Sequence, residues 1–320
     1  MSNFVRDLKG KKILVVGDIM LDHYLFGKVD RISPEAPVPV AKFTEERHVL
    51  GGAANVAANI AALGGVPHLI GVLGNDEPGT VVSSLLKSHG INASLVIDGT
   101  RMTTRKTRIV ARNQQLLRLD YEDTAPIPTM QCKELCAFVS RFAAECELVA
   151  VSDYAKGVVS KELMEAVIKS GKKAVIDPKP KHKALYQNAF LVTPNTSEAA
   201  AMAHMEMEGE KDWNPVAEHI SRELGSNVLL TLGASGMMLF PIGGKSRHFP
   251  SAAREVYDVS GAGDTVVAAV SLGISSGASL EDACWLANMA AGVKVGKFGT
   301  APVSAAELEE VLYAEQNRRA

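Results

Sequence analysis

The segment DVSGAGDTVVAA, from Asp258 to Ala269, combines small residues with two carboxylates. Residues 260–263 let the backbone turn sharply into an apolar run, so several amide N–H groups at a helix start point the same way. Such an arrangement binds phosphate. A carboxylate beside a phosphate is unfavourable, because like charges repel. The two acids, Asp258 and Asp264, therefore need an explanation of their own.

A catalytic role for Asp264 removes this conflict. Its carboxylate could accept a proton from a substrate hydroxyl while the amides of Gly261, Ala262 and Gly263 stabilise a transferring phosphoryl group. The base and the anion hole must adjoin, since the two reactants meet between them. A plainer interpretation stays open, in which Asp264 is a first-turn acid that stabilises the helix dipole.

The segment does not match the familiar nucleotide-binding loops. The motif GxxxxGK[ST] requires a lysine after its second glycine, and this segment has none. The motif GxGxxG requires a third glycine, and Val266 occupies that place. The sequence therefore disfavours a P-loop kinase and a dinucleotide-dependent oxidoreductase.

A second glycine cluster, GGAANVAANIAALGG, spans residues 51–65. Gly51 and Gly52 permit close backbone approach just before an alanine-rich helix, and Asn55 lies in the first turn of that helix. A sugar with several hydroxyls would use such donors and acceptors.

The elements that position these clusters follow from hydrophobic patterning. Helix-period segments such as 133–145 alternate with six short, nearly all-apolar runs, which are KILVVGD, HLIGVLG, ELVAVSD, KAVIDP, AFLVTPN and NVLLTLG. Such runs are typical of strands covered on both faces. The pattern predicts an α/β fold with a doubly wound, mostly parallel sheet. Ligands bind beyond the carboxyl ends of such strands, where this chain has polar residues, although each of these could simply form a turn or helix cap.

Two segments break the rhythm. Residues 22–50 are too polar and proline-rich for a core strand, and residues 103–122 alternate apolar with charged residues like a half-exposed antiparallel hairpin. We predict that they are pieces of one small β-sheet that stands off the main body of a single domain covering residues 1–320. A pair of long surface loops is the alternative.

Composition limits the function classes. The chain has 320 residues, 47% hydrophobic composition and a formal charge of −2, which gives no reason to expect nucleic acid as a partner. No run approaches the roughly 20 apolar residues that span a bilayer, and the N-terminus has no apolar signal core, so we expect a cytoplasmic protein without a membrane partner. The cysteines, with no CxxC pair, are expected to be reduced thiols.

The two glycine clusters together resemble the two signatures of the ribokinase-like (PfkB-type) carbohydrate kinases. The TPN at residues 193–195 followed by Glu198, and the TLGASG at residues 231–236, resemble the same family, so the likeness covers essentially the whole chain. The resemblance implies a doubly wound domain with a β-sheet lid that phosphorylates a hydroxyl with ATP and Mg²⁺. Asp264 falls at the family's catalytic base and residues 261–263 at its anion hole.

Within the family, ILVVGDIMLDHYLFGKVDRISPEAPVPV and SDYAKGVV resemble a bacterial subgroup. Its members phosphorylate the anomeric hydroxyl of D-glycero-D-manno-heptose 7-phosphate to the 1,7-bisphosphate, for ADP-heptose and lipopolysaccharide synthesis. Many are fused to a nucleotidyltransferase, and because this chain ends at Ala320 we expect a free-standing kinase. Ser260, where threonine is frequent, and Ala155, where glycine is frequent in the subgroup, are slight departures.

The resemblance implies a sugar site. Its expected members are Asp18, Asp22, Gly51, Gly52 and Asn55. A phosphorylated sugar also needs cations, and the candidates are Arg105, Lys106, Arg108, Lys156 and Lys179. We favour Arg105, because the planar guanidinium suits phosphate. A merely solvated, charged hairpin is the alternative.

The resemblance also implies a nucleotide site. Asn195 and Glu198 would lie near the ATP phosphates, with Glu198 ordering Mg²⁺-bound water, although the same two residues could form a helix capping box. The expected adenosine pocket consists of Thr231, Gly233, Gly236 and Asn288.

Apolar lid residues predict a homodimer through the lid. They include Val38, Val40, Ile109, Leu116 and Leu117. Two alternatives to the heptose kinase remain, which are a kinase for fructose 1-phosphate or tagatose 6-phosphate and a noncatalytic sugar- or nucleotide-binding protein.

Overall fold

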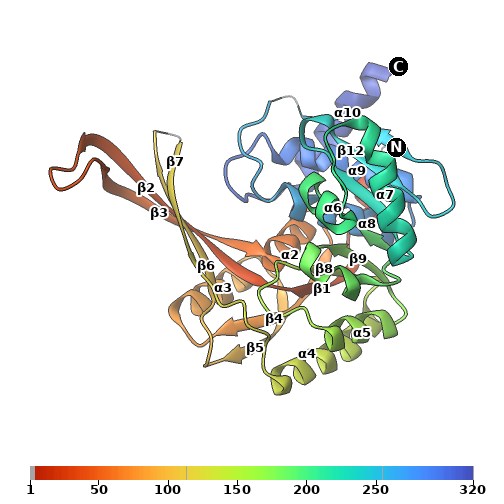
Figure 1. Cartoon of the computed structure of the whole chain (residues 1–320), viewed down its shortest axis with the longest axis horizontal. Coiled ribbons are helices and arrows are strands. Elements are labelled where there is room, and N and C mark those ends of the chain that lie inside the picture. Colours follow the sequence, from red (N-terminus) through yellow and green to blue (C-terminus); the bar gives the residue numbers. More distant parts are fainter. Residues whose placement is uncertain (1–3, 113, 254, 320) are drawn as a thin grey trace.

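The computed structural model describes residues 4–112, 114–253 and 255–319. Its main body is built on a nine-stranded sheet with the order β13-β12-β11-β10-β9-β8-β1-β4-β5 (Figure 1). The strands are β1 (Lys12–Gly17), β4 (Val66–Gly74), β5 (Asn92–Asp98), β8 (Leu148–Ser152), β9 (Lys173–Asp177), β10 (Leu191–Val192), β11 (Asn227–Thr231), β12 (Met237–Phe240) and β13 (Arg247–Phe249).

All six predicted apolar runs form strands of this sheet, as β1, β4, β8, β9, β10 and β11. They pair in parallel, whereas β12 and β13 add an antiparallel edge. The prediction of a mostly parallel sheet is therefore confirmed.

Helices cover both faces of the sheet. Ile13 and Val15 of β1 pack on one side and Leu14 and Val16 on the other, so alternate residues of one strand enter two separate cores. The first core includes α1 (Phe4–Leu8), α2 (Ala53–Ala62), α3 (Glu77–Ser88), α8 (Ala262–Ser275), α9 (Leu280–Lys294) and α10 (Ala305–Arg319). The second includes α4 (Thr129–Phe142), α5 (Lys161–Lys169), α6 (Thr196–Ala203) and α7 (Glu210–Leu224).

Short 3₁₀ turns complete the chain, as η1 (Ala143–Glu145), η2 (Pro180–Tyr186) and η3 (Gly233–Ser235). The helix expected at residues 133–145 thus begins earlier, at Thr129, and its last turn tightens into η1. Across the described residues, no helix is both long and apolar enough to cross a membrane. The four cysteines are free thiols, as expected.

A second sheet projects from the body (Figure 1). Its order is β3-β2-β6-β7, with β2 (Ile19–Ile32), β3 (Pro39–Gly52), β6 (Thr104–Ala111) and β7 (Gln114–Tyr121). Strands β2 and β3 form a long hairpin, and β6 joins β2 in parallel. The two segments that break the sequence rhythm therefore form a four-stranded lid and not surface loops.

The lid sheet has two distinct faces, because successive side chains of a strand point to opposite sides. We call the side that carries Asp22 the inner lid face. Lys106 stands opposite Asp22 and Asp120 stands opposite Lys106, so both lie on this face, as does Arg108, two residues beyond Lys106. The outer lid face carries the intervening residues, among them His23, Arg105, Thr107 and Leu119. This division decides which lid residues can meet the active site.

Candidate active site

Helix α8 begins where the glycine segment predicts. Gly261 is its N-cap residue with a φ of +76°, a left-handed conformation that favours glycine. A Cβ at this position would lie 2.8 Å from Asn55 Nδ2, so the close approach of α2 also requires glycine. The two glycine clusters of the sequence therefore meet at the starts of two packed helices.

Asp264 lies in the first turn of α8 and its side chain is buried, with 3% of the residue exposed. Asn55 Nδ2 donates to Asp264 Oδ2 at 2.6 Å, and the Tyr154 hydroxyl donates to Asp264 Oδ1 at 3.0 Å. Burial raises the pKa of Asp264 to about 6, while these two donors oppose the rise. The carboxylate is therefore ionised at neutral pH but basic enough to take a proton.

The anion hole differs in one detail from the expectation. The amide of Ala262 donates to Val259 O at 3.2 Å, so it is already engaged. The next two amides, those of Gly263 and Asp264, are the first-turn donors that the helix itself does not use. At Gly263 a Cβ would lie 4.0 Å from Asp177 Oδ2, so a carboxylate of β9 faces this turn.

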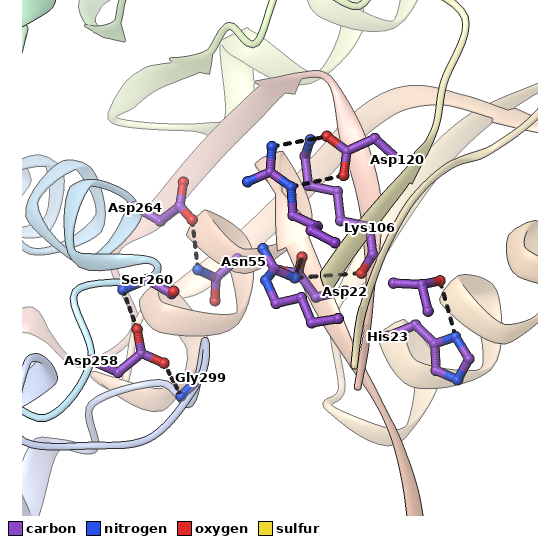
Figure 2. A network of polar contacts seen from close by, with 12 residues as sticks. Asp22, His23, Asn55, Lys106, Asp120, Asp258, Ser260, Asp264 and Gly299 are labelled. Carbon is purple, nitrogen blue, oxygen red and sulfur yellow. Dashed lines mark hydrogen bonds and ion pairs between the residues drawn. The ribbon is translucent and has the colours of Figure 1, made fainter. Parts of the chain in front are cut away.

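Asp22 brings the inner lid face to the same place. Its carboxylate, on a residue only 5% exposed, accepts from Arg108 Nη1 at 2.5 Å. Lys106 Nζ lies 3.0 Å from Asp120 Oδ2 on the same face. Figure 2 shows Asp22 near Asn55 and Asp264, with Lys106 and Asp120 further along the lid. Asp22 and its partner Arg108 thus approach Asn55 and Asp264 from the lid, and Lys106 lies on the same lid face.

The two glycines before α2 make room for these acids. A Cβ on Gly51 would lie 2.9 Å from Asp22 Oδ2, and one on Gly52 would lie 2.3 Å from Asp18 O. Gly52 also has a φ of +57°. Both positions therefore require glycine because the backbone passes directly against β2.

The structure does not bring Arg105 to this site. Its side chain lies on the outer lid face, where the guanidinium carbon sits 4.4 Å from the centroid of the Tyr121 ring. The sequence pattern correctly indicated a half-exposed hairpin. Deciding which of its three cations faces the sugar site, however, required the register of β6 against β2. That register turns Lys106 and Arg108, not Arg105, toward Asp22.

Asp18 also differs from the expectation of direct sugar contact. Its carboxylate accepts from the amides of Tyr154 at 2.8 Å, Lys156 at 3.1 Å and Val158 at 3.2 Å. Both oxygens are therefore used to hold the loop after β8. Lys156 in turn reaches the lid, where its Nζ lies 2.7 Å from Glu122 Oε1.

Lys179 and Glu198 form an ion pair beside the base. Burial disfavours the charge of Lys179, but its hydrogen bond to Glu198 and the nearby carboxylates outweigh burial and raise its pKa. Its ammonium also lies 5.1 Å from the centroid of the Tyr154 ring, whose hydroxyl contacts Asp264. Lys179 is therefore a fixed positive charge near the Asp264 carboxylate.

The NTSE segment forms a helix capping box, as the sequence allows for Asn195 and Glu198. Asn195 Oδ1 accepts from the amide of Glu198 at 2.9 Å, and Glu198 Oε2 accepts from the amide of Asn195 at 3.0 Å. The other oxygen of Glu198 contacts Lys179. Glu198 is thereby held in place at the start of α6.

Asp177 and Tyr154 complete the site, although the sequence did not single them out. Asp177 is the last residue of β9 and Tyr154 lies just after β8, so their positions at strand ends were visible in the sequence but their roles were not. Burial first, and then the charges of Asp264 and Glu198, raise the pKa of Asp177 well above its usual range. These three carboxylates are not close enough to share one ion directly, so a divalent cation here would be held largely through water, which Mg²⁺ retains readily.

The residues expected around adenosine gather at the β11 end of the sheet. Gly236, at φ +89°, leaves a Cβ no room, because it would lie 2.1 Å from Phe249 O. Asn288 donates to Pro250 O at 2.8 Å and lines a cavity of about 500 Å³ between the segment at 247–253 and helices α9 and α10. Thr231 pairs with Asn195, and Gly233 faces open space, but neither lines this cavity.

The family assignment agrees with this arrangement. Residues 10–306 match the model of the pfkB family carbohydrate kinases, and the chain belongs to that family. It is therefore a phosphotransferase that acts on a sugar hydroxyl, built on the ribokinase-like fold.

Curated relatives are similar over nearly the whole chain. The protein named bifunctional protein HldE from Desulfatibacillum aliphaticivorans is 41% identical over 94% of this chain, and its namesake from Caulobacter vibrioides is 42% identical over 96%. The chain spans only 63% and 65% of the length of these two relatives.

Solved structures share the fold. Phosphofructokinase-2 from Escherichia coli, in its tetrameric inhibited form, has a TM-score of 0.80 at 21% identity over 97% of this chain and 100% of its own. Ribokinase from Arabidopsis thaliana, complexed with ribose and ATP, has a TM-score of 0.74 at 20% identity over 95% and 99%.

Proposed function

We propose that this chain transfers a phosphoryl group from ATP to the anomeric hydroxyl of D-glycero-D-manno-heptose 7-phosphate, giving the 1,7-bisphosphate for ADP-heptose and lipopolysaccharide synthesis. The observation that carries the proposal is the placement of the buried Asp264 carboxylate opposite a lid face that presents Arg108 and Lys106. The subgroup motifs and the relatives named HldE support the choice of heptose.

The chemistry assigned to Asp264 is general base catalysis. The anomeric oxygen loses its proton to the Asp264 carboxylate and forms a bond to the γ-phosphorus, while the bond from that phosphorus to the ADP oxygen breaks. Asn55 and Tyr154 hold both carboxylate oxygens, so the base is oriented before the substrate arrives. The amides of Gly263 and Asp264 face the charge that develops on the phosphoryl oxygens.

Lys179, Asp177 and Glu198 would serve the nucleotide side. Lys179 supplies a fixed positive charge, and Asp177 and Glu198 would hold the water shell of Mg²⁺, which neutralises phosphate charge when bound. We also assign Asn195, Thr231, Gly233, Gly236 and Asn288 to the ATP side, on the strength of the family resemblance and their position at the β11 end of the sheet.

The sugar phosphate end is assigned to the inner lid face. Arg108 has a planar guanidinium suited to a phosphate group, and Lys106 lies on the same face. Asp22 is placed to accept a sugar hydroxyl, whereas Asp18 positions the loop after β8. A substrate held at both ends presents only its far hydroxyl to Asp264.

We further propose that the described residues act as one kinase domain whose lid segments lie at about 22–50 and 103–122. The lid also pairs with a second copy of the chain. Val38, Leu116 and Leu117 are 51%, 41% and 49% exposed, and a sheet of this size leaves them in water unless another surface covers them.

The deciding experiment is phosphorus NMR of the product formed from heptose 7-phosphate, together with matched kinetics on the unphosphorylated heptose. We expect a new phosphate on the anomeric oxygen and a catalytic efficiency orders of magnitude lower without the 7-phosphate. Phosphate on another oxygen, or equal efficiency without the 7-phosphate, overturns the heptose assignment. A panel with fructose 1-phosphate and tagatose 6-phosphate tests the related substrates, and failure to consume ATP with any sugar indicates a binding protein.

A further inference from the structure

Three potential metal ligands meet on the outer lid face. His23 of β2 stands directly opposite His48 of β3, and Glu46 lies two residues further along the same face of β3. The ring centroids of the two histidines are 4.4 Å apart, and one ligand atom from each of the three side chains lies within 4.8 Å of the others. Among the described residues, this is the group of three His, Cys, Asp or Glu side chains whose ligand atoms lie close enough to share one ion.

The contacts of His23 orient it as a ligand. Its Nδ1 lies 3.3 Å from Thr107 Oγ1, and its Nε2 lies 3.3 Å from Glu46 Oε2. A hydrogen bond from the second ring nitrogen to a neighbouring group is the usual way in which a protein fixes a metal-binding imidazole.

We propose that His23, Glu46 and His48 bind one divalent transition-metal ion of the zinc class. In tetrahedral zinc sites with bonds of about 2.0–2.2 Å, neighbouring ligand atoms lie roughly 3.4 Å apart, which matches the separation of His23 Nε2 and Glu46 Oε2. His48 is half-buried and Glu46 is exposed, so both side chains can turn to complete the geometry. Two imidazoles and a carboxylate suit zinc better than magnesium, and water takes the fourth position.

This site is separate from the catalytic centre. Figure 2 shows His23 across the lid strands from Asp264, and the lid sheet itself lies between them. All three ligands come from β2 and β3, which leave the body next to Asp18 and Gly52. A bound ion would therefore clamp the base of the lid hairpin without touching the substrate.

The test is zinc binding to the intact chain with excess Mg²⁺ present, measured by chelator competition, and the absorption spectrum of the cobalt-substituted protein. Because thiols also bind zinc, all variants carry Cys136→Ser. We expect one ion per chain with a tetrahedral cobalt spectrum. His48→Ala and Glu46→Gln should each weaken binding at least ~10-fold, and Thr107→Val should weaken it by a comparable factor through the orientation of His23.

A matched control is His219→Ala. His219 Nε2 lies 3.4 Å from Glu223 Oε2 on α7, a histidine–carboxylate pair that, among the described residues, has no third ligand atom close enough to share an ion. Its loss should leave zinc binding unchanged. Circular dichroism and kinase turnover confirm that each variant is folded. Absence of stoichiometric zinc, unchanged affinity in folded His48→Ala, or an octahedral cobalt spectrum would each overturn the proposal.

Discussion

Asn55 and Asp264 share a hydrogen bond of 2.6 Å, although 209 residues of sequence separate them. The bond joins the first turn of α2 to the first turn of α8, and Gly261 permits it because any Cβ there would displace the Asn55 amide. The two glycine clusters therefore form one structural unit that orients a buried carboxylate.

Replacing Asp264 tests its proposed role as the general base. Asp264→Asn keeps the size of the side chain but cannot accept the proton, so we expect turnover to fall by at least ~10²-fold. The affinities for ATP and sugar phosphate, measured by calorimetry, should change little. Glu165→Gln, on the exposed side of α5, serves as a charge-matched control. Turnover near the wild-type value would remove Asp264 from the mechanism.

The pH dependence of turnover follows from the raised pKa of Asp264. The base must be ionised to act, so kcat should fall as the pH drops through the value of about 6 and level off only well above it. Asn55 and Tyr154 each lower this pKa, with Asn55 the stronger of the two. Asn55→Ala should therefore move the acid limb of the profile to higher pH, and Tyr154→Phe should move it less. An acid limb that stays in place in both variants would show that another group titrates.

The two faces of β6 provide a comparison of neighbouring cations. Arg108→Ala removes an inner-face guanidinium and should raise the KM for the sugar phosphate well above any effect on the KM for ATP. Arg105→Ala removes a charge of the same kind from the outer face and should leave both values within about twofold, in the range of a solvated surface charge. The reverse order, measured by steady-state kinetics, would place the phosphate on the other side of the lid.

The proposed lid dimer predicts a measurable mass. Static light scattering at micromolar concentration should give about twice the chain mass of 34.0 kDa. Leu117 and Leu119, 49% and 41% exposed on the outer lid face, should sustain the association, so the double variant Leu117→Glu/Leu119→Glu should be monomeric. Met130→Glu, at an 80% exposed position of α4, should remain dimeric. A wild-type monomer would contradict the proposal.

Much of the fold was predictable because buried parallel strands have a distinctive composition. The six apolar runs and the two lid segments were found from patterning alone. Strands covered on both faces need apolar residues at successive positions, whereas strands of a half-exposed sheet alternate apolar with polar residues. The edge strands β5, β12 and β13 were not found. Met237–Phe240 and Arg247–Phe249 are too short for a pattern to be read, and Asn92–Asp98 is mostly exposed or half-buried, so it has no continuous apolar run.

The site was predictable where one segment contains the chemistry, as at residues 261–264. It was not predictable where the role depends on which way a side chain points. Arg105 and Lys106 are adjacent cations that only the strand register separates, and Asp18 and Asp22 are similar carboxylates that only their hydrogen-bond partners distinguish. Tyr154 contacts Asp264 through a loop that is held by Asp18, a relationship between three distant segments.

The packing of α8 against α2 also constrains how the protein reaches its active form. The lid, Asn55 and strand β1 all precede residue 123, whereas Asp264 comes much later in the chain. Contacts between such distant segments form slowly, because the intervening chain must be ordered first. During synthesis the lid and α2 therefore emerge from the ribosome well before Asp264. If Asp264 is the base, as proposed, a nascent chain that ends before α8 should not turn over ATP.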